Sequence, residues 1–305
     1  MVSSKISAID IRFFTVFLRE RAANLGHYAH SFRIKHRHYS MFSQIVTPYL
    51  PIFLATNSFN GYNCIRKHAG GKPMYLYETH LHTAPVSRCG RRSVRDCLTF
   101  YKQIGYDGVF ITNHFIDGNI NMDASVPYAE RIHFYFSDYE EGEKIGKELG
   151  IKVFCGVEMS NGGTDFLVYG LDKQWYLAHE ELQQMPYSAR LTYLKENGAL
   201  IIQAHPYREA GYIDHIRLFP RHVEGVEIFN AGTQELANKM AEHYAAMYQL
   251  QPFAGSDNHV AEDQRMLGGI RCQTPISDMA DFIQKFRNHA CTPFVKENPL
   301  LAVNP

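Results

Sequence analysis

The strongest constraint on the fold is a series of short apolar runs, each followed directly by a cluster of polar residues. Segments with the amphipathic period of helices separate these runs. The polar clusters are, in order, ETHLH (78–82), TNH (112–114), GVE (156–158), QAHP (203–206) and GSDNH (255–259). Buried strands that alternate with helices are typical of a parallel sheet covered by helices. We therefore expect an α/β fold with these polar clusters at the ends of strands.

The expected elements alternate regularly after the glycine pair at 70–71. Strands are expected over 74–77, 107–112, 151–157, 166–169, 199–204, 225–229 and 252–255. Helices are expected over 93–105, 139–150, 188–197, 234–248 and 279–289, with Ser93 as an N-cap. Barrels of such units gather their catalytic groups at one mouth. An open doubly wound sheet usually carries a glycine-rich phosphate turn after its first strand, and none is present, so the pattern favours a barrel.

Two of the clusters contain residues spaced by two positions. In an extended strand, such residues point to the same face and lie about 7 Å apart. His80 with His82, and Asp257 with His259, can therefore face one group of ions. Imidazoles and carboxylates are the ligands that borderline divalent metals prefer. The sequence predicts a multi-metal hydrolytic centre.

Charge is distributed unevenly along the chain. The 305 residues carry no net charge, but residues 1–72 hold ten Lys or Arg and two Asp or Glu, which gives this segment about +8. Clustered basic residues can attract nucleic acid or an anionic surface. Residues 1–73 show no sustained helical or strand period, however. The plainer hypothesis is a poorly ordered or non-native extension before a folded domain at 74–305.

Cysteine spacing and hydropathy give an expectation for the compartment in which the protein is found. The six cysteines form no CxxC pair and no even pattern, so they predict neither a zinc ribbon nor a disulfide framework. A reducing cytoplasm is the default expectation. The apolar stretch at 41–55 is broken by polar and proline residues, and no apolar run of 18 residues occurs. We expect a soluble cytoplasmic protein with no membrane span.

The five clusters resemble the motifs of the PHP (polymerase and histidinol phosphatase) domain family. That family has an initial HxH, a Thr-Asp-His, a Glu after the third strand, an Ala-His-Pro and a final Ser-Asp-x-His. This chain reads ETHLHT, ITNHF, GVEMS, QAHPY and GSDNH in the same order, over roughly 74–287. The resemblance implies a distorted (β/α)7 TIM-like barrel that holds two or three divalent ions (Zn, Mn or Fe) and hydrolyses phosphate esters.

The resemblance also implies a ligand set, with Glu158 bridging the first two of three ions. The ligands are His80, His82 and Asp257 for the first ion, His205 for the second, and His114 and His259 for the third. Taken singly, a histidine after a strand is more often a hydrogen-bonded structural residue than a ligand. Because five motifs occur in the family's order, we expect these residues to be metal ligands.

Three positions depart from the family pattern. Asn113 stands where the family commonly has Asp, and Ser87-Arg-Cys89-Gly90 stands where it often has Ser-Asp-Gly. Asp165 lies near the place of a family histidine and is a further candidate ligand. Cys89 is expected to be a small buried hydrophobe more often than a metal-proximal thiol. The number of ions, two or three, therefore stays open.

Other candidates surround this set. Arg208 and Arg265 follow two of the clusters and could bind a substrate phosphate through paired N–H groups, although either could equally be a solvated loop residue. Glu227 and Asn230 end a strand and are expected at the site rim, where they could orient ligands.

We expect a metal-dependent phosphoesterase that acts on a small phosphomonoester or a nucleotide. Residues 73–305 are acidic overall and lack a basic stripe, which argues against a long nucleic acid as the substrate. One alternative is C–N bond hydrolysis in an amidohydrolase-type barrel, which usually adds a carboxylated lysine where this chain has Glu158. Another is a non-catalytic, metal-stabilised PHP scaffold. The sequence names neither the substrate nor the oligomeric state.

Overall fold

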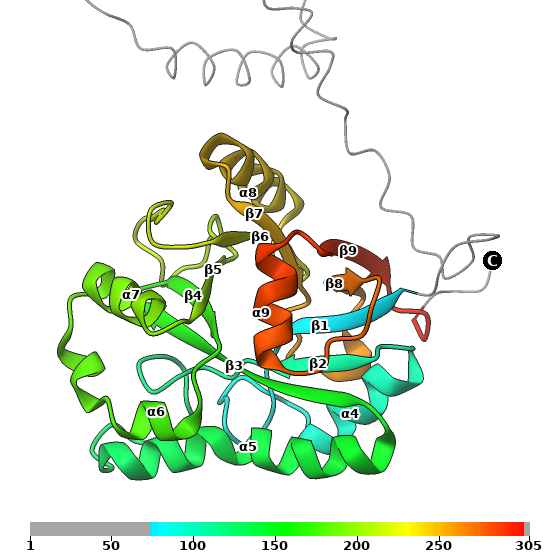
Figure 1. Cartoon of the computed structure of the whole chain (residues 1–305), viewed down its shortest axis with the longest axis horizontal. Helices are drawn as coiled ribbons and strands as arrows, with labels where there is room; N and C mark the ends of the chain where they lie inside the picture. The colour runs from blue at the N-terminus through cyan, green and yellow to red at the C-terminus, as the bar shows by residue number, and fades with distance from the viewer. Residues whose placement is uncertain (1–73, 302–305) are drawn as a thin grey trace, which may run out of the picture. The chain divides into compact units, whose positions relative to one another are not determined.

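The computed structural model describes residues 74–301, in which helices pack on the outside of a curved mixed sheet (Figure 1). The strands are β1 (Tyr75–Leu81), β2 (Gly108–Ile111), β3 (Lys152–Asn161), β4 (Thr164–Tyr169), β5 (Leu200–Ala204), β6 (Gly225–Asn230), β7 (Gln251–Gly255), β8 (Met266–Cys272) and β9 (Cys291–Glu297). The α-helices are α4 (Val94–Gln103), α5 (Tyr128–Leu149), α6 (Lys173–Leu177), α7 (Tyr187–Glu196), α8 (Glu235–Tyr248) and α9 (Met279–Arg287). The predicted extension at 1–73 lies outside the described residues, so its state stays a prediction.

The strand order is β7-β6-β5-β4-β3-β2-β1-β8-β9 within the described residues. Strands β1 to β3 are mutually parallel, as are β5 to β7. Strand β7 also lies against β1, β8 and β9, which nearly closes the sheet. The predicted α/β barrel is therefore confirmed, in a distorted form.

The expectation of an all-parallel sheet is wrong at two places. Strand β4 runs antiparallel to both β3 and β5. Gly162 and Gly163, with φ of 55° and 82°, form a turn too short for a helical crossover, so the chain reverses as a hairpin. Strands β8 and β9 were not predicted, and they add an antiparallel ribbon beside β1. Gly269 in β8 has a φ of 145°, and a Cβ there would collide with the Tyr77 carbonyl.

Helix boundaries follow local signals where those signals exist. Ser93 caps α4 as predicted, and it forms a capping box in which its hydroxyl accepts from the Asp96 N–H at 3.2 Å. Helix α5 ends at Gly150, which adopts the left-handed conformation that the glycine stop predicts. Its start lies eleven residues earlier than expected, directly after Pro127. The first half of α5 is rich in aromatic residues, which hid its helical period.

Aromatic side chains fill one end of the barrel. Phe282 of α9, which lies across the strands in Figure 1, packs against Phe110 and Tyr169 with ring centroids 4.5 and 5.3 Å apart. Tyr169 pairs with Leu200, the first residue of β5, so this cluster lies toward the amino ends of the parallel strands. The carboxyl ends of those strands, where the polar motifs lie, are left at the opposite end.

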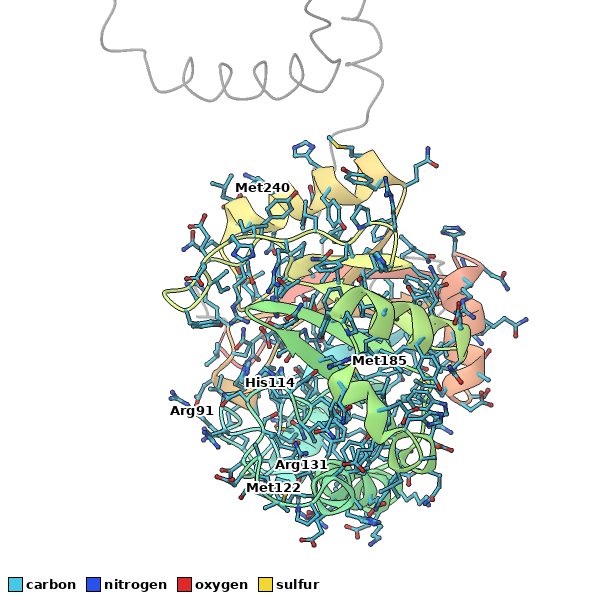
Figure 2. The ribbon with its side chains drawn as sticks, turned by 90° about the vertical axis from the view of Figure 1, so that its left-hand side faces the viewer. Arg91, His114, Met122, Arg131, Met185 and Met240 are labelled. Carbon is cyan, nitrogen blue, oxygen red and sulfur yellow. A yellow bond between two sulfur atoms is a disulfide. The ribbon has the colours of Figure 1, made fainter. Side chains whose placement is uncertain are left out.

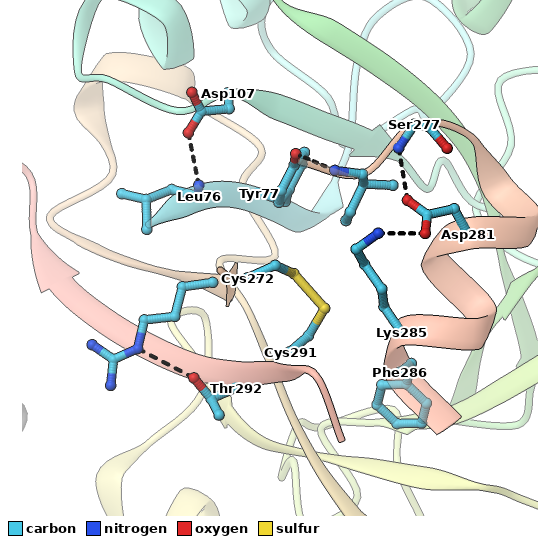
Figure 3. Close-up of a disulfide and its surroundings, with 12 residues drawn as sticks. Leu76, Tyr77, Asp107, Cys272, Ser277, Asp281, Lys285, Phe286, Cys291 and Thr292 are labelled. Atoms are coloured by element: carbon cyan, nitrogen blue, oxygen red, sulfur yellow. Dashed lines mark hydrogen bonds and ion pairs between the residues drawn. A yellow bond between two sulfur atoms is a disulfide. The ribbon is translucent and has the colours of Figure 1, made fainter. Parts of the chain in front are cut away.

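A disulfide, which the cysteine spacing did not predict, joins Cys272 to Cys291 (Figure 3). The two residues are 19 apart in sequence, and α9 lies between them, so their spacing gives no sign of the bond. The antiparallel register of β8 and β9 places them directly opposite each other, with Cα atoms 4.6 Å apart. Disulfides persist mainly in oxidising compartments, so the default argument for a reducing cytoplasm is weakened.

No helix within residues 74–301 is long and apolar enough to span a membrane.

Candidate metal centre

All seven predicted metal ligands converge at the carboxyl ends of the parallel strands. His80 belongs to β1 and Glu158 to β3, and the others lie one to four residues after a strand ends: His82, His114, His205, Asp257 and His259. Figure 2 labels His114 among the side chains of the described residues. Whether these residues bind metal stays a prediction, but their geometry can be compared with what an ion requires.

Backbone pairing beyond the regular strands brings the motifs together. The His82 N–H donates to the Asn258 carbonyl at 3.0 Å, and the Asn258 N–H donates to the His80 carbonyl at 3.2 Å. These bonds pair the HxH segment with the DxH segment side by side, as in two parallel strands. The Phe115 N–H donates to the Glu158 carbonyl at 2.8 Å, which extends β2 beside β3 and sets His114 next to Glu158.

Four buried side chains form the first cluster, at the point that the sequence predicts for the first ion. His80 Nε2 lies 3.2 Å from Glu158 Oε1, and His82 Nε2 lies 3.1 Å from Asp257 Oδ1. The two Nε2 atoms are 3.1 Å apart. Two imidazole nitrogens and two carboxylates thus face one small volume, which is the donor set of a divalent cation.

Glu158 lies at the middle of the whole centre. Its Oε1 is 3.2 Å from Nε2 of both His80 and His205, while its Oε2 is 3.3 Å from His82 Nε2 and 2.7 Å from His114 Nδ1. Despite the short distance, Glu158 Oε2 and His114 Nδ1 are both buried without a hydrogen bond of acceptable geometry. Buried polar atoms are rarely left unpaired. The donor set therefore fits ions that Glu158 would bridge.

A second group of donors surrounds His205. His205 Nε2 lies 3.8 Å from Asp165 Oδ2 on β4, so Asp165 reaches the site as the sequence suggested. The His205 N–H donates to Glu227 Oε2 at 3.0 Å, and His205 has a φ of 26°. This conformation, unusual for a residue with a Cβ, turns the imidazole toward Glu158.

A third group contains a residue that sequence analysis undervalued. The thiol of Cys89 and the ring nitrogens of His82, His114 and His259 lie within 4.8 Å of one another. Burial alone would raise the pKa of the Cys89 thiol, but hydrogen bonds to His114 and His259 outweigh it and lower the pKa to about 6. The signal available in the sequence was the position of Cys89, in the loop where the family often has an acidic residue.

The electrostatics of the buried cluster suit a cation. Burial would raise the pKa of Glu158 and of Asp257, but the facing imidazoles hold both pKa values well below the usual range. Burial and the neighbouring imidazoles lower the pKa of His82, whereas Asp257, Glu227 and Glu158 outweigh burial and raise that of His80. The negative charge that attracts a proton to His80 would equally attract a metal ion.

Further polar groups hold the imidazoles in place. His80 Nδ1 is 2.9 Å from Glu227 Oε1, and the amide of Asn230 donates to Glu227 Oε2 at 2.8 Å. Sequence analysis placed Glu227 and Asn230 at the rim, but both are fully buried beneath the ligands. Such partners fix the ring orientation and the tautomer of a ligating histidine.

The departure at Asn113 has a structural explanation. Its Oδ1 accepts from the Thr83 N–H at 2.7 Å and from the Ser87 hydroxyl at 2.8 Å, while its Nδ2 donates to Asp138 Oδ2 at 3.0 Å. Asp138 is a buried residue of α5 that sequence analysis did not single out. An aspartate at position 113 would set two buried carboxylates against each other. Asn113 instead secures the loop that carries Cys89.

The two predicted phosphate-binding arginines lie in different settings. Arg208 Nη1 is 3.0 Å from Asp257 Oδ2 and 3.4 Å from His205 Nε2, at the edge of the centre. Arg265 is exposed just before β8, and within residues 74–301 no hydrogen bond or ion pair joins its side chain to a candidate ligand. Only Arg208 is positioned beside the centre.

Two hollows among the described residues differ in their distance from the centre. A cavity of about 160 Å³ adjoins Arg208, and it is lined by residues of the 207–216 loop, of the 232–234 segment and of α8, including Tyr207, Ile216, Gly232, Leu236 and Met240. A larger hollow of about 680 Å³ lies beside α9, next to Gly170 and Gly198. The second hollow is remote from every candidate ligand, so only the smaller cavity bears on the site.

Comparison with known proteins gives a partial match in sequence and a wider match in structure. Residues 235–291 match the profile of the PHP-associated family. A search of curated protein sequences finds no match. A two-domain protein from Bacteroides vulgatus, containing a predicted PHP-like metal-dependent phosphoesterase, superposes with a TM-score of 0.56 at 15% identity, over 76% of this chain and 69% of its own.

Two further solved structures are more distant. PsfC from Pseudomonas syringae has a TM-score of 0.49 at 17% identity, over 73% of this chain and 91% of its own. An amidohydrolase from Chromobacterium violaceum, solved with bound sulfate and without metal, has a TM-score of 0.39 at 13% identity, over 62% of this chain and 89% of its own.

Proposed function

We propose that this chain, a PHP-domain family protein by its fold and its C-terminal match, is a metal-dependent phosphoesterase. The observation that carries the proposal is Glu158, whose two carboxylate oxygens each face two imidazole nitrogens. A carboxylate that bridges two ions presents its two oxygens to two sets of ligands in this way. Paired divalent ions activate water near neutral pH and stabilise the charge that develops in phosphoryl transfer.

The donor types limit the metals to a few. Neutral imidazoles suit Zn or Fe, and carboxylates also accept Mn, so two or three ions of these kinds are proposed. The first ion would be held by His80, His82, Glu158 and Asp257, where each imidazole Nε2 already lies within 3.4 Å of an oxygen of both carboxylates. Availability in the cell decides among these metals as much as affinity does.

The chain's own residues supply substrate binding and orientation. The Arg208 guanidinium, whose side chain is 27% exposed beside Asp257, can turn its remaining N–H groups to a phosphate oxygen. The adjoining cavity of about 160 Å³ suits a small organic group, which supports a small phosphomonoester or nucleotide over a long nucleic acid. A cytoplasmic location remains part of this proposal, with the Cys272–Cys291 bond as the observation against it.

The test is hydrolysis of a generic aryl phosphate by the full chain with added Mn²⁺ or Zn²⁺. His82→Ala and Asp257→Ala are each expected to reduce turnover at least about 1000-fold, because each would remove an ion ligand and Asp257→Ala would also remove a negative charge. His133→Ala, an exposed change on α5, serves as the matched histidine control and is expected to leave turnover intact. Metal-loaded, folded parent protein without turnover would contradict the proposal.

C–N bond hydrolysis is the second candidate for the same centre. In that class a carboxylated lysine usually bridges the ions from a middle strand, whereas in this proposal Glu158 of β3 would bridge them. Parallel assays on aryl amides separate the two reactions. Turnover of an amide but not of a phosphate, lost in Asp257→Ala, would assign the chain to the second class.

Arg208 provides a prediction about substrate binding. Arg208→Ala is expected to lower kcat/KM for an aryl phosphate about 10- to 100-fold, because a hydrogen bond to a charged group contributes about 1.5–3 kcal/mol. The exposed Arg265→Ala change is the matched control and should shift kcat/KM by no more than about 2-fold. Equal losses in both variants would show that Arg208 has no special role.

A further inference from the structure

The loop that carries Cys89 is built to hold its thiol over the centre. A Cβ at Gly90 would lie 2.7 Å from the Thr83 carbonyl carbon, so the glycine lets the loop fold back closely on the end of β1. The Arg91 N–H donates to the His259 carbonyl at 2.8 Å, and the Ala84 N–H donates to the Arg92 carbonyl at 2.9 Å. Backbone bonds thus fix Cys89 beside His259 before any ligand binds.

Only two of the three imidazoles around the thiol are free to share an ion with it. His82 Nε2 faces Glu158 and Asp257 in the first cluster, and His82 Nδ1 is 3.2 Å from the Ser87 hydroxyl. Both nitrogens of His82 are therefore engaged. This leaves His114, together with His259, as the imidazole partners of Cys89.

The hydrogen bond of His259 selects its tautomer. His259 Nδ1 lies 2.8 Å from the Asp257 carbonyl, and a carbonyl oxygen can only accept a hydrogen bond. Nδ1 must therefore carry the proton, which leaves Nε2 with the lone pair that a metal requires. This backbone contact is the usual device that orients a ligating histidine.

We propose that the thiolate of Cys89, with the imidazoles of His114 and His259, forms a thiolate-containing zinc position in this centre. The family's usual residue in this loop is an acidic one, so the sulfur ligand is a property of this chain. Three protein ligands leave the fourth tetrahedral position open, as in catalytic zinc sites. Ligation requires a thiolate and two neutral imidazoles, so any proton that these three groups carry leaves to solvent. A soft thiolate favours Zn over Mn, so this position differs in selectivity from the carboxylate-rich first cluster.

The inference rests on metal binding in the proposed function, and its test does not depend on turnover. The full chain is loaded with Co²⁺, and thiolate-to-cobalt charge-transfer absorption is measured in the near ultraviolet. Zinc-loaded protein is examined by X-ray absorption, where a sulfur neighbour is expected at about 2.3 Å. Both signals are expected in the parent and in Cys155→Ser, a matched control on β3, and both should vanish in Cys89→Ser.

Zinc titration gives a third readout. Cys89→Ser is expected to weaken the affinity of this position at least about 100-fold, since losing a group that merely orients a ligand already costs about 10- to 100-fold. Cys89→Asp keeps an anionic ligand, so it should retain the ion but lose the sulfur signals. Circular dichroism of both variants checks that they fold, and a folded Cys89→Asp keeps the test decisive if Cys89→Ser does not fold.

The outcomes separate this inference from the proposed function. Aryl phosphate turnover in a protein whose zinc has only nitrogen and oxygen neighbours would overturn the role of Cys89 and leave the phosphoesterase proposal standing. A sulfur neighbour that persists in Cys89→Ser would also overturn it. Sulfur coordination that depends on Cys89, in a protein without phosphatase activity, would support this inference and contradict the proposed function.

Discussion

Glu158→Gln is expected to lower metal-dependent hydrolysis of an aryl phosphate at least about 1000-fold. One lost electrostatic stabiliser typically costs about 100- to 1000-fold, and Glu158 faces the donors of more than one ion. An amide keeps the shape of the side chain but loses the negative charge and one acceptor oxygen. Its nitrogen would point hydrogens at His80 and His205 or at His82 and His114, according to the orientation of the amide.

The measurement pairs steady-state kinetics with metal analysis of the dialysed protein. Glu158→Gln should retain fewer ions per chain than the parent. Glu141→Gln, an exposed change on α5, is the matched control and should retain both turnover and metal. Full metal content and near-normal turnover in Glu158→Gln would show that Glu158 does not bridge ions.

Glu78→Ala is expected to cost about 3–5 kcal/mol of the free energy of unfolding. Glu78 is fully buried, and its Oε1 accepts the backbone N–H groups of Thr79, His80 and Ser256 at 2.9–3.0 Å. Its Oε2 accepts from the Tyr101 hydroxyl at 2.8 Å and from the Ser256 hydroxyl. Truncation would strand several buried donors, each worth about 1–3 kcal/mol.

Urea unfolding of the metal-free protein measures this cost directly. Glu148→Ala is the matched control, because Glu148 pairs with Arg95 at the surface, where both side chains are more than half exposed, and such pairs contribute about 1 kcal/mol or less. If the two variants unfolded at the same urea concentration, the hydrogen bonds by which Glu78 joins β1, α4 and the residue after β7 would not contribute to stability.

Sequence reasoning located the residues that depend on short-range geometry. His80 with His82, and Asp257 with His259, needed only the two-residue period of an extended chain, and the structure places Asp257 Oδ1 within 3.7 Å of all three imidazoles. The cap of α4 at Ser93 was likewise a local signal. Interactions within a few residues leave a pattern that one sequence can show.

The parts that sequence reasoning missed depend on contacts between distant segments. Cys89 lies in an irregular loop, and its partners are 25 and 170 residues away along the chain. The Cys272–Cys291 bond depends on the register of β8 and β9. Strand β8 was not predicted because it contains two adjacent glycines, which are uncommon inside strands. The burial of Glu227 beneath His80 was missed for the same reason. A residue at the end of a strand can lie at the exposed rim of a site or buried below its ligands, and the sequence does not distinguish the two positions.

Two candidate ligands adopt backbone conformations that favour glycine. His205 has a φ of 26° and Asp257 a φ of 50°, so each holds its side chain in place against a local steric preference. Substituting glycine would ease the backbone while removing an ion ligand. In the metal-free protein, thermal stability and the capacity to bind metal can therefore change in opposite directions, and a laboratory selection for heat resistance without added metal would favour sequences that have lost the centre.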